Sequence, residues 1–448
     1  MKRSLLIGLL MLVSMHAFDE LVLVISLPAI TEQLGGEHWY GLCLAAYMLA
    51  ALVAVAGAGD WIDHQGPAGI MQFGISIACV GLVMAALAPD IGWLIAARVL
   101  QGIGGGIGWT VAYSVVNRVC APQDKSRVVA MLDTAWLIPS LLAPAVGGFL
   151  VDQVSWHWIF WIQVPFVLFT LWLLRPLIKD LSYEVKPRNF DSLTNALWIG
   201  LLGFSIVWII SNPLSIWWGL LIPLIVGLWR PMNKVLPAGW LQLNNPLAVA
   251  VVFNGLIFFA FFGTETFMPL FLIEERGFST TSAGLMFTCG AFSWVVASFS
   301  QSYIDRYIAH QRSMIIGNLV LLGVILMVVV QLNPNANAQW MYVAWVLAGF
   351  GMGLTFNSAM TAAMLATEDS SEGATASAIG IAQSLAIGLA SGAGGAIKNQ
   401  VEFNGGELSF ALLLIWLLMG SVFLLSLWVA YKKFPAAKDW YAEKTKEE

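Results

Sequence analysis

The sequence has little charge. Only 10% of its 448 residues are charged, whereas 59% are hydrophobic and the mean hydropathy is +0.80. A soluble globular domain has roughly 25% charged residues, so this chain cannot cover its surface with polar groups in water. The net charge of −5 is spread thinly along the chain. It leaves no basic surface for a nucleic acid, and we expect no nucleic-acid partner.

Cysteine and histidine are also scarce. The four cysteines, Cys43, Cys79, Cys120 and Cys289, all fall in or beside apolar stretches, which argues against a disulfide framework or a zinc site. The five histidines are scattered, and no His-Glu-x-x-His motif occurs. We therefore expect no metal, no cofactor and no enzymatic activity.

What the sequence has instead is long apolar runs. A helix that crosses a bilayer needs about 20 apolar residues. Fourteen runs qualify, at about 5–30, 41–60, 68–88, 91–118, 127–151, 157–175, 192–211, 214–230, 246–272, 280–304, 313–331, 338–364, 373–397 and 408–431. The first run continues to Ile30, so we interpret it as a span and not as a cleaved leader. The connections are too short for a soluble domain.

Basic residues fall almost entirely on one side of this arrangement. Only Arg276 and Lys398 lie in loops of the opposite side, and Arg98 lies within a span. Lysine and arginine are enriched in cytoplasmic loops. The chain is thus expected in the cell membrane, the inner or plasma membrane, in contact with the lipid bilayer. Both termini are expected in the cytoplasm.

An internal repeat divides the chain. The segment Val99–Gly106 matches Val346–Gly353, with glycines at three alternate positions in each. Many transporters consist of two similar halves with the substrate site between them near the midplane. We predict a six-helix N-terminal half at 1–178, a linker with two further helices at 179–240, a six-helix C-terminal half at 241–434 and a charged tail at 435–448.

Several motifs resemble those of the major facilitator superfamily, and within it the fourteen-span drug:proton antiporters. In the first span Asp19 and Leu27-Pro28 match that group's Leu-Asp-x-Thr-Ile-Val-Asn-Val-Ala-Leu-Pro. The fourth-span motif Arg-x-x-Gln-Gly-x-Gly is intact from Arg98 to Gly104. The segment 155–165, Ser-Trp-His-Trp-Ile-Phe-Trp-Ile-Gln-Val-Pro, is similar to the family's Trp-Arg-Trp-Ile-Phe-x-Ile-Asn-x-Pro.

Two motifs depart from the family pattern. The loop motif Gly-x-x-x-Asp-Arg-x-Gly-Arg retains Gly59, Asp63 and Gly66 but neither arginine. The antiporter motif Gly-x-x-x-Gly-Pro-x-x-Gly-Gly of the fifth span retains Pro144 and the pair Gly147-Gly148, and both leading glycines are replaced. These departures leave the mode of transport open.

The resemblance implies an all-α membrane fold of two six-helix halves related by a pseudo-twofold axis, with a two-helix insertion and fourteen spans in total. It also implies a cytoplasmic gate at Gly59, Asp63 and Gly66, with Asp305 and Arg306 at a similar place in the second half. Ordinary solvated loop charges are the alternative interpretation. Pro144 with Gly147 and Gly148 would bend and thin the fifth helix, or simply pack it closely.

Charged residues within spans are the sharpest functional signal. Each costs a few kcal/mol on insertion scales, so it normally faces a cavity or a partner. Burial disfavours an ionised carboxyl group and a nearby arginine favours it, and both effects suit a proton carrier. We predict proton coupling by Asp19, Arg98 and Glu265, with a structural ion pair as the alternative for Asp19 and Arg98. The substrate cavity is predicted to contain His16, Glu20, Asp133, Asn254 and Asn357, although interhelical hydrogen bonding is the alternative for the asparagines.

The sequence therefore predicts a proton-coupled secondary transporter that exports lipophilic compounds, including cationic ones, by antiport with alternating access. Its partners would be protons and a small-molecule substrate, and it would act as a monomer. A proton symporter or a facilitator of a small metabolite is the alternative within the same class. A channel or an intramembrane enzyme is a remote alternative, because the sequence has neither a filter-like segment nor a catalytic constellation.

Overall fold

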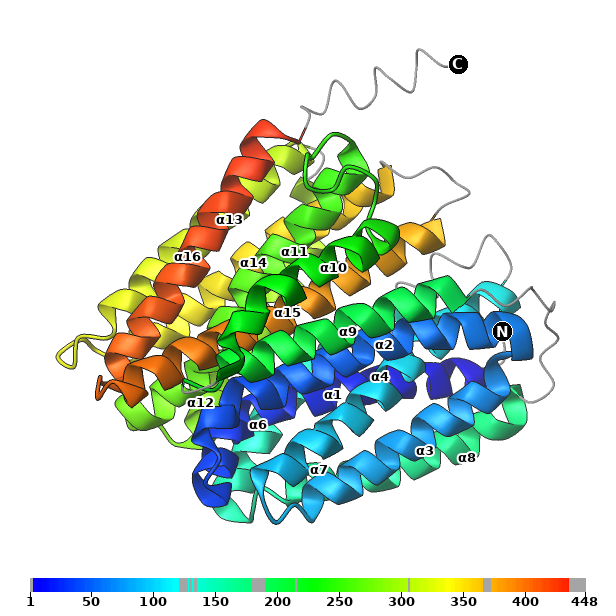
Figure 1. Ribbon diagram of the computed structural model, residues 1–448, viewed down its shortest axis with the longest axis horizontal. Helices are drawn as coiled ribbons and strands as arrows, with labels where there is room; N and C mark the ends of the chain where they lie inside the picture. The colour runs from blue at the N-terminus through cyan, green and yellow to red at the C-terminus, as the bar shows by residue number, and fades with distance from the viewer. Residues whose placement is uncertain are drawn as a thin grey trace.

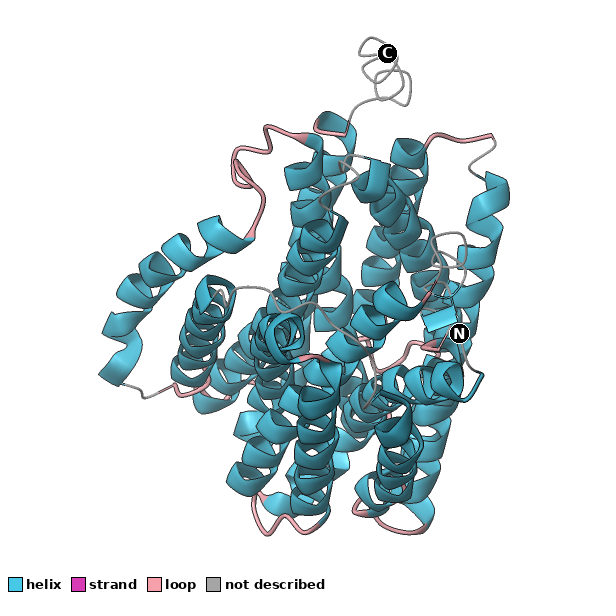
Figure 2. Ribbon diagram, turned by 90° about the vertical axis from the view of Figure 1, so that its right-hand side faces the viewer, coloured by secondary structure: helices cyan, strands magenta, loops and turns pink. Residues whose placement is uncertain are grey.

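The computed structural model describes residues 3–120, 128, 131–132, 135–178, 190–213, 216–304, 307–365 and 372–434. Every regular element in these ranges is a helix, and none is a strand (Figure 2). The all-α prediction is confirmed. Helices suit this composition because backbone N–H and C=O groups in a lipid environment must find their partners within the segment itself.

The chain forms its helices in three groups. The first group is α1 (Arg3–Leu34), η1 (Glu37–Trp39), α2 (Tyr40–Gln65), α3 (Pro67–Ala86), α4 (Ile91–Val119), α6 (Leu137–Gln153), α7 (Trp158–Trp161) and α8 (Gln163–Ile178). The second is α9 (Phe190–Ile210), η2 (Ile216–Leu220) and α10 (Leu221–Val235). The third is α11 (Pro246–Leu270), η3 (Phe271–Glu275), α12 (Thr280–Ile304), α13 (His310–Val330), α14 (Trp340–Leu365), α15 (Glu372–Phe403) and α16 (Leu408–Lys432).

Local sequence signals set several helix ends. The Asp90 carboxylate accepts from the backbone N–H of Trp93 at 2.9 Å and caps α4. Asn245 caps α11 in the same way, through the N–H of Ala248 at 2.7 Å. Between α2 and α3, Gly66 has a φ of +78°, a conformation that favours glycine, and Pro67 then opens α3.

The first and third groups pack in the same way, and we call them the N half (α1–α8) and the C half (α11–α16). In the N half α4 packs against α2 and α3, and α1 against α6 and α8. In the C half α14 packs against α12 and α13, and α11 against α15 and α16. Figure 1 shows the N half in blue to cyan and teal and the C half in green to red, with the green helices α9 and α10 beside them.

The repeated glycines explain this likeness. A Cβ at Gly102 would lie 2.3 Å from the backbone oxygen of Tyr47 on α2, and one at Gly349 would lie 2.0 Å from that of Gly290 on α12. Two residues further, Gly351 on α14 approaches the backbone of Gly317 on α13 as Gly104 on α4 approaches α3. The sequence repeat thus encodes the same two close helix contacts in each half.

The predicted fourteen spans are not confirmed. By length and composition, twelve of the described helices can cross a membrane, and α9 is one of them. The described part of α6 has 17 residues and α10 has 15. A 15-residue helix is about 22 Å long at 1.5 Å per residue, shorter than the roughly 30 Å hydrocarbon core.

The halves meet along two seams, α6 with α12 and α2 with α15. We use "distal end" for the end of the bundle that carries the turns at residues 35–36, 276–279 and 404–407, opposite to the start of α1. At the distal end, the helices of each seam are close enough for the backbone of one to touch the backbone of the other. A Cβ at Gly284 would lie 2.1 Å from the carbonyl oxygen of Pro144, and one at Gly41 would lie 2.2 Å from that of Ser391. Helix α9 covers only the α2–α15 seam, and α10 packs on α9 (Figure 1).

Candidate substrate and proton site

An ion pair lies in the middle of the N half. Arg98 of α4 donates from Nη1 to the Asp19 carboxylate of α1 at 2.7 Å, and the side chains are only 1% and 8% exposed. The same nitrogen donates to Gln101 at 2.8 Å, and the guanidinium lies 4.1 Å from the ring centroid of Tyr47. The geometry confirms that Arg98 reaches Asp19.

The second carboxylate oxygen of Asp19 is also bound. The Gln163 side-chain amide donates to it at 3.2 Å and to the carbonyl of Ile159 at 2.9 Å. Asp19 therefore has partners from α4 and α8, which offset the cost of burying its charge. Sequence reasoning did not select Gln101, Gln163 or Tyr47 as site residues. The i, i+3 spacing of Arg98 and Gln101 was a usable signal for the first, and both glutamines lie in the quoted motifs.

His16 lies one turn before Asp19 and faces an aromatic group. Its Nδ1 shares a hydrogen bond with the Tyr47 hydroxyl. Its ring lies 6.3 Å from that of Trp109 and 5.7 Å from that of Trp136. His16, Asp19, Gln101 and Gln163 line a cavity inside the N half with room for a few water molecules. This cavity is polar along α1 and apolar along α3.

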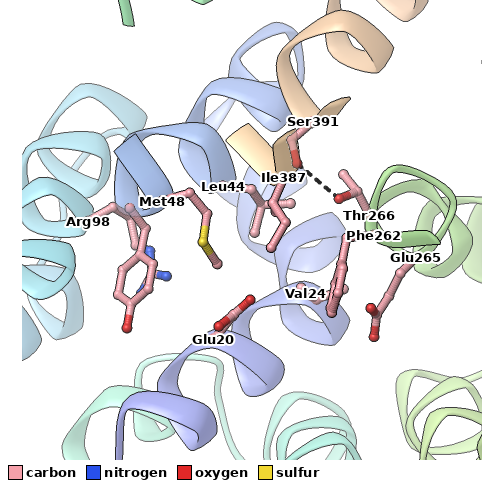
Figure 3. Close-up of a pocket in the computed structure, with 11 residues that line it drawn as sticks. Glu20, Val24, Leu44, Met48, Arg98, Phe262, Glu265, Thr266, Ile387 and Ser391 are labelled. Atoms are coloured by element: carbon pink, nitrogen blue, oxygen red, sulfur yellow. Dashed lines mark hydrogen bonds between the residues drawn. The ribbon is translucent and has the colours of Figure 1, made fainter. Parts of the chain in front are cut away.

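A second cavity lies between the halves and has room for about one water molecule. Glu20 of α1, Tyr47 of α2 and Arg98 of α4 line it from the N half, and Glu265 of α11 lines it from the C half. Figure 3 shows Glu20 and Glu265 on their two helices, with the Thr266 and Ser391 hydroxyls hydrogen-bonded to each other at 3.1 Å. The remaining lining residues are apolar: Val24, Leu44, Met48, Phe262 and Ile387.

The two carboxyl groups of this cavity are buried without hydrogen bonds. Glu20 is 8% exposed and Glu265 is 7% exposed. Among the residues that the structure describes, no side chain or backbone group bonds to either, and Oε2 of Glu265 is an unsatisfied buried atom. Buried acids of this kind at membrane depth mark an ion or substrate pathway.

The predicted asparagines lie elsewhere. Asn254 is fully buried, donates to the carbonyl of Ala250 and accepts from Gln383 of α15 at 3.4 Å. Asn357 is half-buried, and its Nδ2 has no hydrogen-bond partner. Neither residue lines the two cavities, so the structure does not bring them together with His16 and Glu20. Asp133 lies outside the described residues.

The predicted gate residues pair within one half. Arg118 of α4 donates to the Asp63 carboxylate of α2 at 3.1 Å and to the carbonyl of Ile62 at 3.3 Å. Gly66 supplies the turn after α2, whereas a Cβ at Gly59 would meet nothing within 4 Å. These contacts join α2 to α4 and do not cross between the halves. Asp305 and Arg306 lie outside the described residues.

The predicted antiporter-motif helix forms part of a seam. A Cβ at Gly147 would lie 2.7 Å from the side chain of Val22 on α1, and one at Gly148 would lie 2.4 Å from the backbone oxygen of Thr280 on α12. The carbonyl of Pro144 faces Gly284 of α12. The three residues thus pack α6 against both its own half and the other half.

Comparisons with known proteins agree with this architecture. A sequence profile described as the Major Facilitator Superfamily matches residues 9–394. "Multidrug resistance protein 3" of Bacillus subtilis (strain 168) is 23% identical over 89% of this chain and 80% of its own length. "Multidrug transporter protein MdtP" of the same strain is 26% identical over 79% of this chain and 67% of its own length. The crystal structure of a D-xylose-proton symporter covers 96% of this chain and 98% of its own, with a TM-score of 0.68 at 16% identity, and so shares the fold.

Proposed function

Because the chain belongs to the Major Facilitator Superfamily, whose members are membrane transporters and not enzymes, we propose that it is a proton-coupled exporter of lipophilic compounds. The single observation that carries this proposal is the cavity between the halves, where Glu20 and Glu265 are buried without hydrogen-bond partners. The relatives named for multidrug resistance support export as the direction.

Asp19, Arg98 and Glu265 carry out the coupling in this proposal. In the present state Arg98 forms an ion pair with Asp19, since its Nη1 lies 2.7 Å from the acid. A rearrangement within the N half that draws α4 away from α1 as the halves rock breaks this ion pair and lets Asp19 bind a proton. Glu265 lies on the other half and lacks such a cation, so it exchanges its proton as the cavity opens to either side.

The substrate binds beside these acids. The rings of His16, Tyr47, Trp109 and Trp136 and the thioether of Met48 offer an adaptable apolar wall, with Glu20 to attract a positive charge. Alternating access then requires both distal seams to open. Because both seams lie within one chain, a monomer is sufficient.

We further propose fourteen spans, with both termini in the cytoplasm and the distal end outside. The α9–α10 hairpin then crosses the bilayer beside the two halves. A single cysteine at Gly219, which is exposed in η2, should react with a membrane-impermeant maleimide added from outside, as should one at Asn335. Reaction at Asn335 alone would favour an interfacial hairpin and twelve spans. A reporter fused after Glu448 should read as cytoplasmic.

Proton symport or facilitation of a small metabolite is the second candidate. The observation that favours it is the fifth-span motif, in which both leading glycines of the antiporter pattern are replaced. Flux measurements in proteoliposomes separate the two modes. In an antiporter, substrate accumulates on the side from which protons leave, whereas in a symporter the two move together.

The test of coupling is Asp19→Asn in purified, reconstituted protein. Asparagine keeps the shape of the side chain but carries no proton, so uphill transport driven by a pH gradient should disappear while substrate binding persists. Glu37→Gln, an exposed position at the distal end, is the control and should transport normally. Full gradient-driven transport by Asp19→Asn would remove Asp19 from the coupling mechanism.

A further inference from the structure

Glu20 and Glu265 lie on corresponding helices of the two halves, α1 and α11. α1 and α11 each pack against the central glycine-rich helix of their half, α4 or α14, and the two helices contact each other across the midline. The two carboxyl groups line one cavity, which is also lined by residues of α2, α4 and α15 (Figure 3). The cavity therefore receives one acid from each half.

Most of the other polar groups around this cavity already have partners, although Nε of Arg98 is a buried donor without one among the described residues. The Arg98 charge is matched by Asp19 at 2.7 Å, and the Tyr47 hydroxyl is bonded to His16. The hydroxyls of Thr266 and Ser391 are bonded to each other. Glu20, Glu265, Arg98 and Tyr47 are the titratable groups that line the cavity among the described residues, and Asp19 lies behind Arg98.

When ionised, Glu20 and Glu265 thus place two negative charges in a buried cavity whose lining cation, Arg98, is already paired with Asp19. Two like charges in one buried site repel each other, and an uncompensated buried charge is costly. Neutrality requires two positive charges from outside the protein. These can be two protons, one proton with one monovalent organic cation, or one divalent organic cation.

We propose that Glu20 and Glu265 form one exchange site in which the number of protons displaced equals the charge of the bound organic cation. A monovalent cation displaces one proton and a divalent cation displaces two, while a neutral compound displaces none. The carboxylic O–H bond breaks and the proton leaves to water. The cation takes its place beside the carboxylate when the halves move apart, because the cavity in the present state has room for only about one water molecule. This inference rests on the proposed export of cationic compounds and adds the rule by which charge is conserved.

The experiment measures proton release on ligand binding by the full-length protein in detergent, in weakly buffered neutral solution with a pH-sensitive dye. The probes are tetraphenylphosphonium with one positive charge, dequalinium with two, and neutral triphenylphosphine oxide. The expected release per bound ligand is one proton, two protons and none, respectively.

Glu20→Gln and Glu265→Gln should each limit release to one proton with dequalinium. Each should weaken dequalinium binding by at least about tenfold, equivalent to 1.4 kcal/mol, and affect tetraphenylphosphonium less. Glu20→Asp and Glu265→Asp keep both acids and should still release two protons, so they test the site even where a glutamine variant does not fold. Glu37→Gln is the matched control for loss of one acid outside the cavity.

Equal proton release with the two cations in the wild-type protein would overturn the proposal. Release of two protons by either glutamine variant would also overturn it. The proposal would fail as well if neither cation binds to the protein. The proposed export function is judged separately, by pH-gradient-driven transport of a wider compound panel in proteoliposomes. Normal export with equal proton release would leave that function standing and remove only the charge rule.

Discussion

The first and fourth long helices of each half contact each other, α1 with α4 in the N half and α11 with α14 in the C half, but through different side chains. In the N half, α4 contacts α1 through the buried Arg98–Asp19 ion pair. The residue that corresponds to Arg98 in the repeat is Trp345 of α14, which stacks on Phe261 of α11 with ring centroids 5.9 Å apart. Both positions are fully enclosed, at 1% and 3% exposure. The backbone contacts are shared, and the chemistry between the helices is not.

This difference means that the two halves surround their buried acids in different ways. Polar side chains from α4 and α8 bind the Asp19 carboxylate in the N half, so its charge has partners. In the middle of the C half, aromatic rings of Phe261, Phe287 and Trp345 pack together, and Glu265 faces the other half without a local cation among the described residues. The N half holds a buried ion pair beside Glu20, and the C half presents Glu265 without such a pair among the described residues.

The largest effect should come from breaking the ion pair on one side only. Arg98→Met leaves the Asp19 carboxylate buried without its cation, and we expect a loss of about 3–5 kcal/mol in the free energy of unfolding. The double variant Arg98→Met with Asp19→Asn removes both charges and should recover much of that loss, but not transport. Thermal unfolding in detergent and flux in proteoliposomes measure the two properties. Equal destabilisation in the single and double variants would show that packing, not charge, dominates here.

The shared backbone contacts can be tested in the C half alone. Gly349→Ala places a Cβ 2.0 Å from the backbone oxygen of Gly290, which cannot move as a side chain would. We expect a loss of about 1–3 kcal/mol in stability from this overpacking. Gly323→Ala in α13 is the matched control, because a Cβ there meets nothing within 4 Å, and it should be neutral or slightly stabilising. If both variants melt alike, the repeated glycines do not determine the packing of the halves.

The two seams differ as well. At the α6–α12 seam, the Asp152 carboxylate accepts from the backbone N–H groups of Thr280 and Thr281 at the start of α12. At the α2–α15 seam, Asn399 of α15 donates at 2.7 Å to each of the carbonyls of His38 and Ser211, and so joins α15 to η1 and to the end of α9.

Breaking each seam should therefore open the distal end. Asp152→Ala removes a helix-capping interaction worth about 0.5–2 kcal/mol, and Asn399→Leu leaves two carbonyls unbonded at a cost of about 1–3 kcal/mol. Spin-label distances across the distal end should lengthen in both variants. Because α9 covers only the second seam, a larger opening in Asp152→Ala would indicate that the hairpin restrains the other side. No lengthening in either variant would argue that the glycine contacts alone keep this end closed.

The smallest effect is expected at the aromatic stack. Trp345→Phe keeps a ring against Phe261 and removes little volume, so we expect a loss below about 1.5 kcal/mol and unchanged proton coupling. Melting temperature and pH-gradient-driven uptake are the measurements. A coupling defect in this variant would mean that the C half does more than support Glu265.

The sequence predicted the helical class, the two related halves and the family, because long apolar runs and repeated glycines act over short stretches of chain. It also predicted the Asp19–Arg98 contact from the depth of each residue in its span. For Asn254 the structure shows the alternative interpretation, an interhelical hydrogen bond with Gln383 of α15, and the role of Asn357 in a substrate cavity stays a prediction. The fourteen spans are not confirmed and stay a proposal, because α10 has only 15 residues.

By itself, the sequence determined which charged side chains lie within membrane spans. Burial of such a charge is energetically costly, so each is expected to face a binding partner or a cavity. Only the tertiary structure decided which of them have such partners. Asp19 and Glu20 are adjacent in the chain, yet the rotation of about 100° per helical residue turns one toward Arg98 and Gln163 and the other toward the interface between the halves. Glu265 meets Glu20 there because α1 and α11 are brought together by helix packing between distant segments, which no local pattern in the chain specifies.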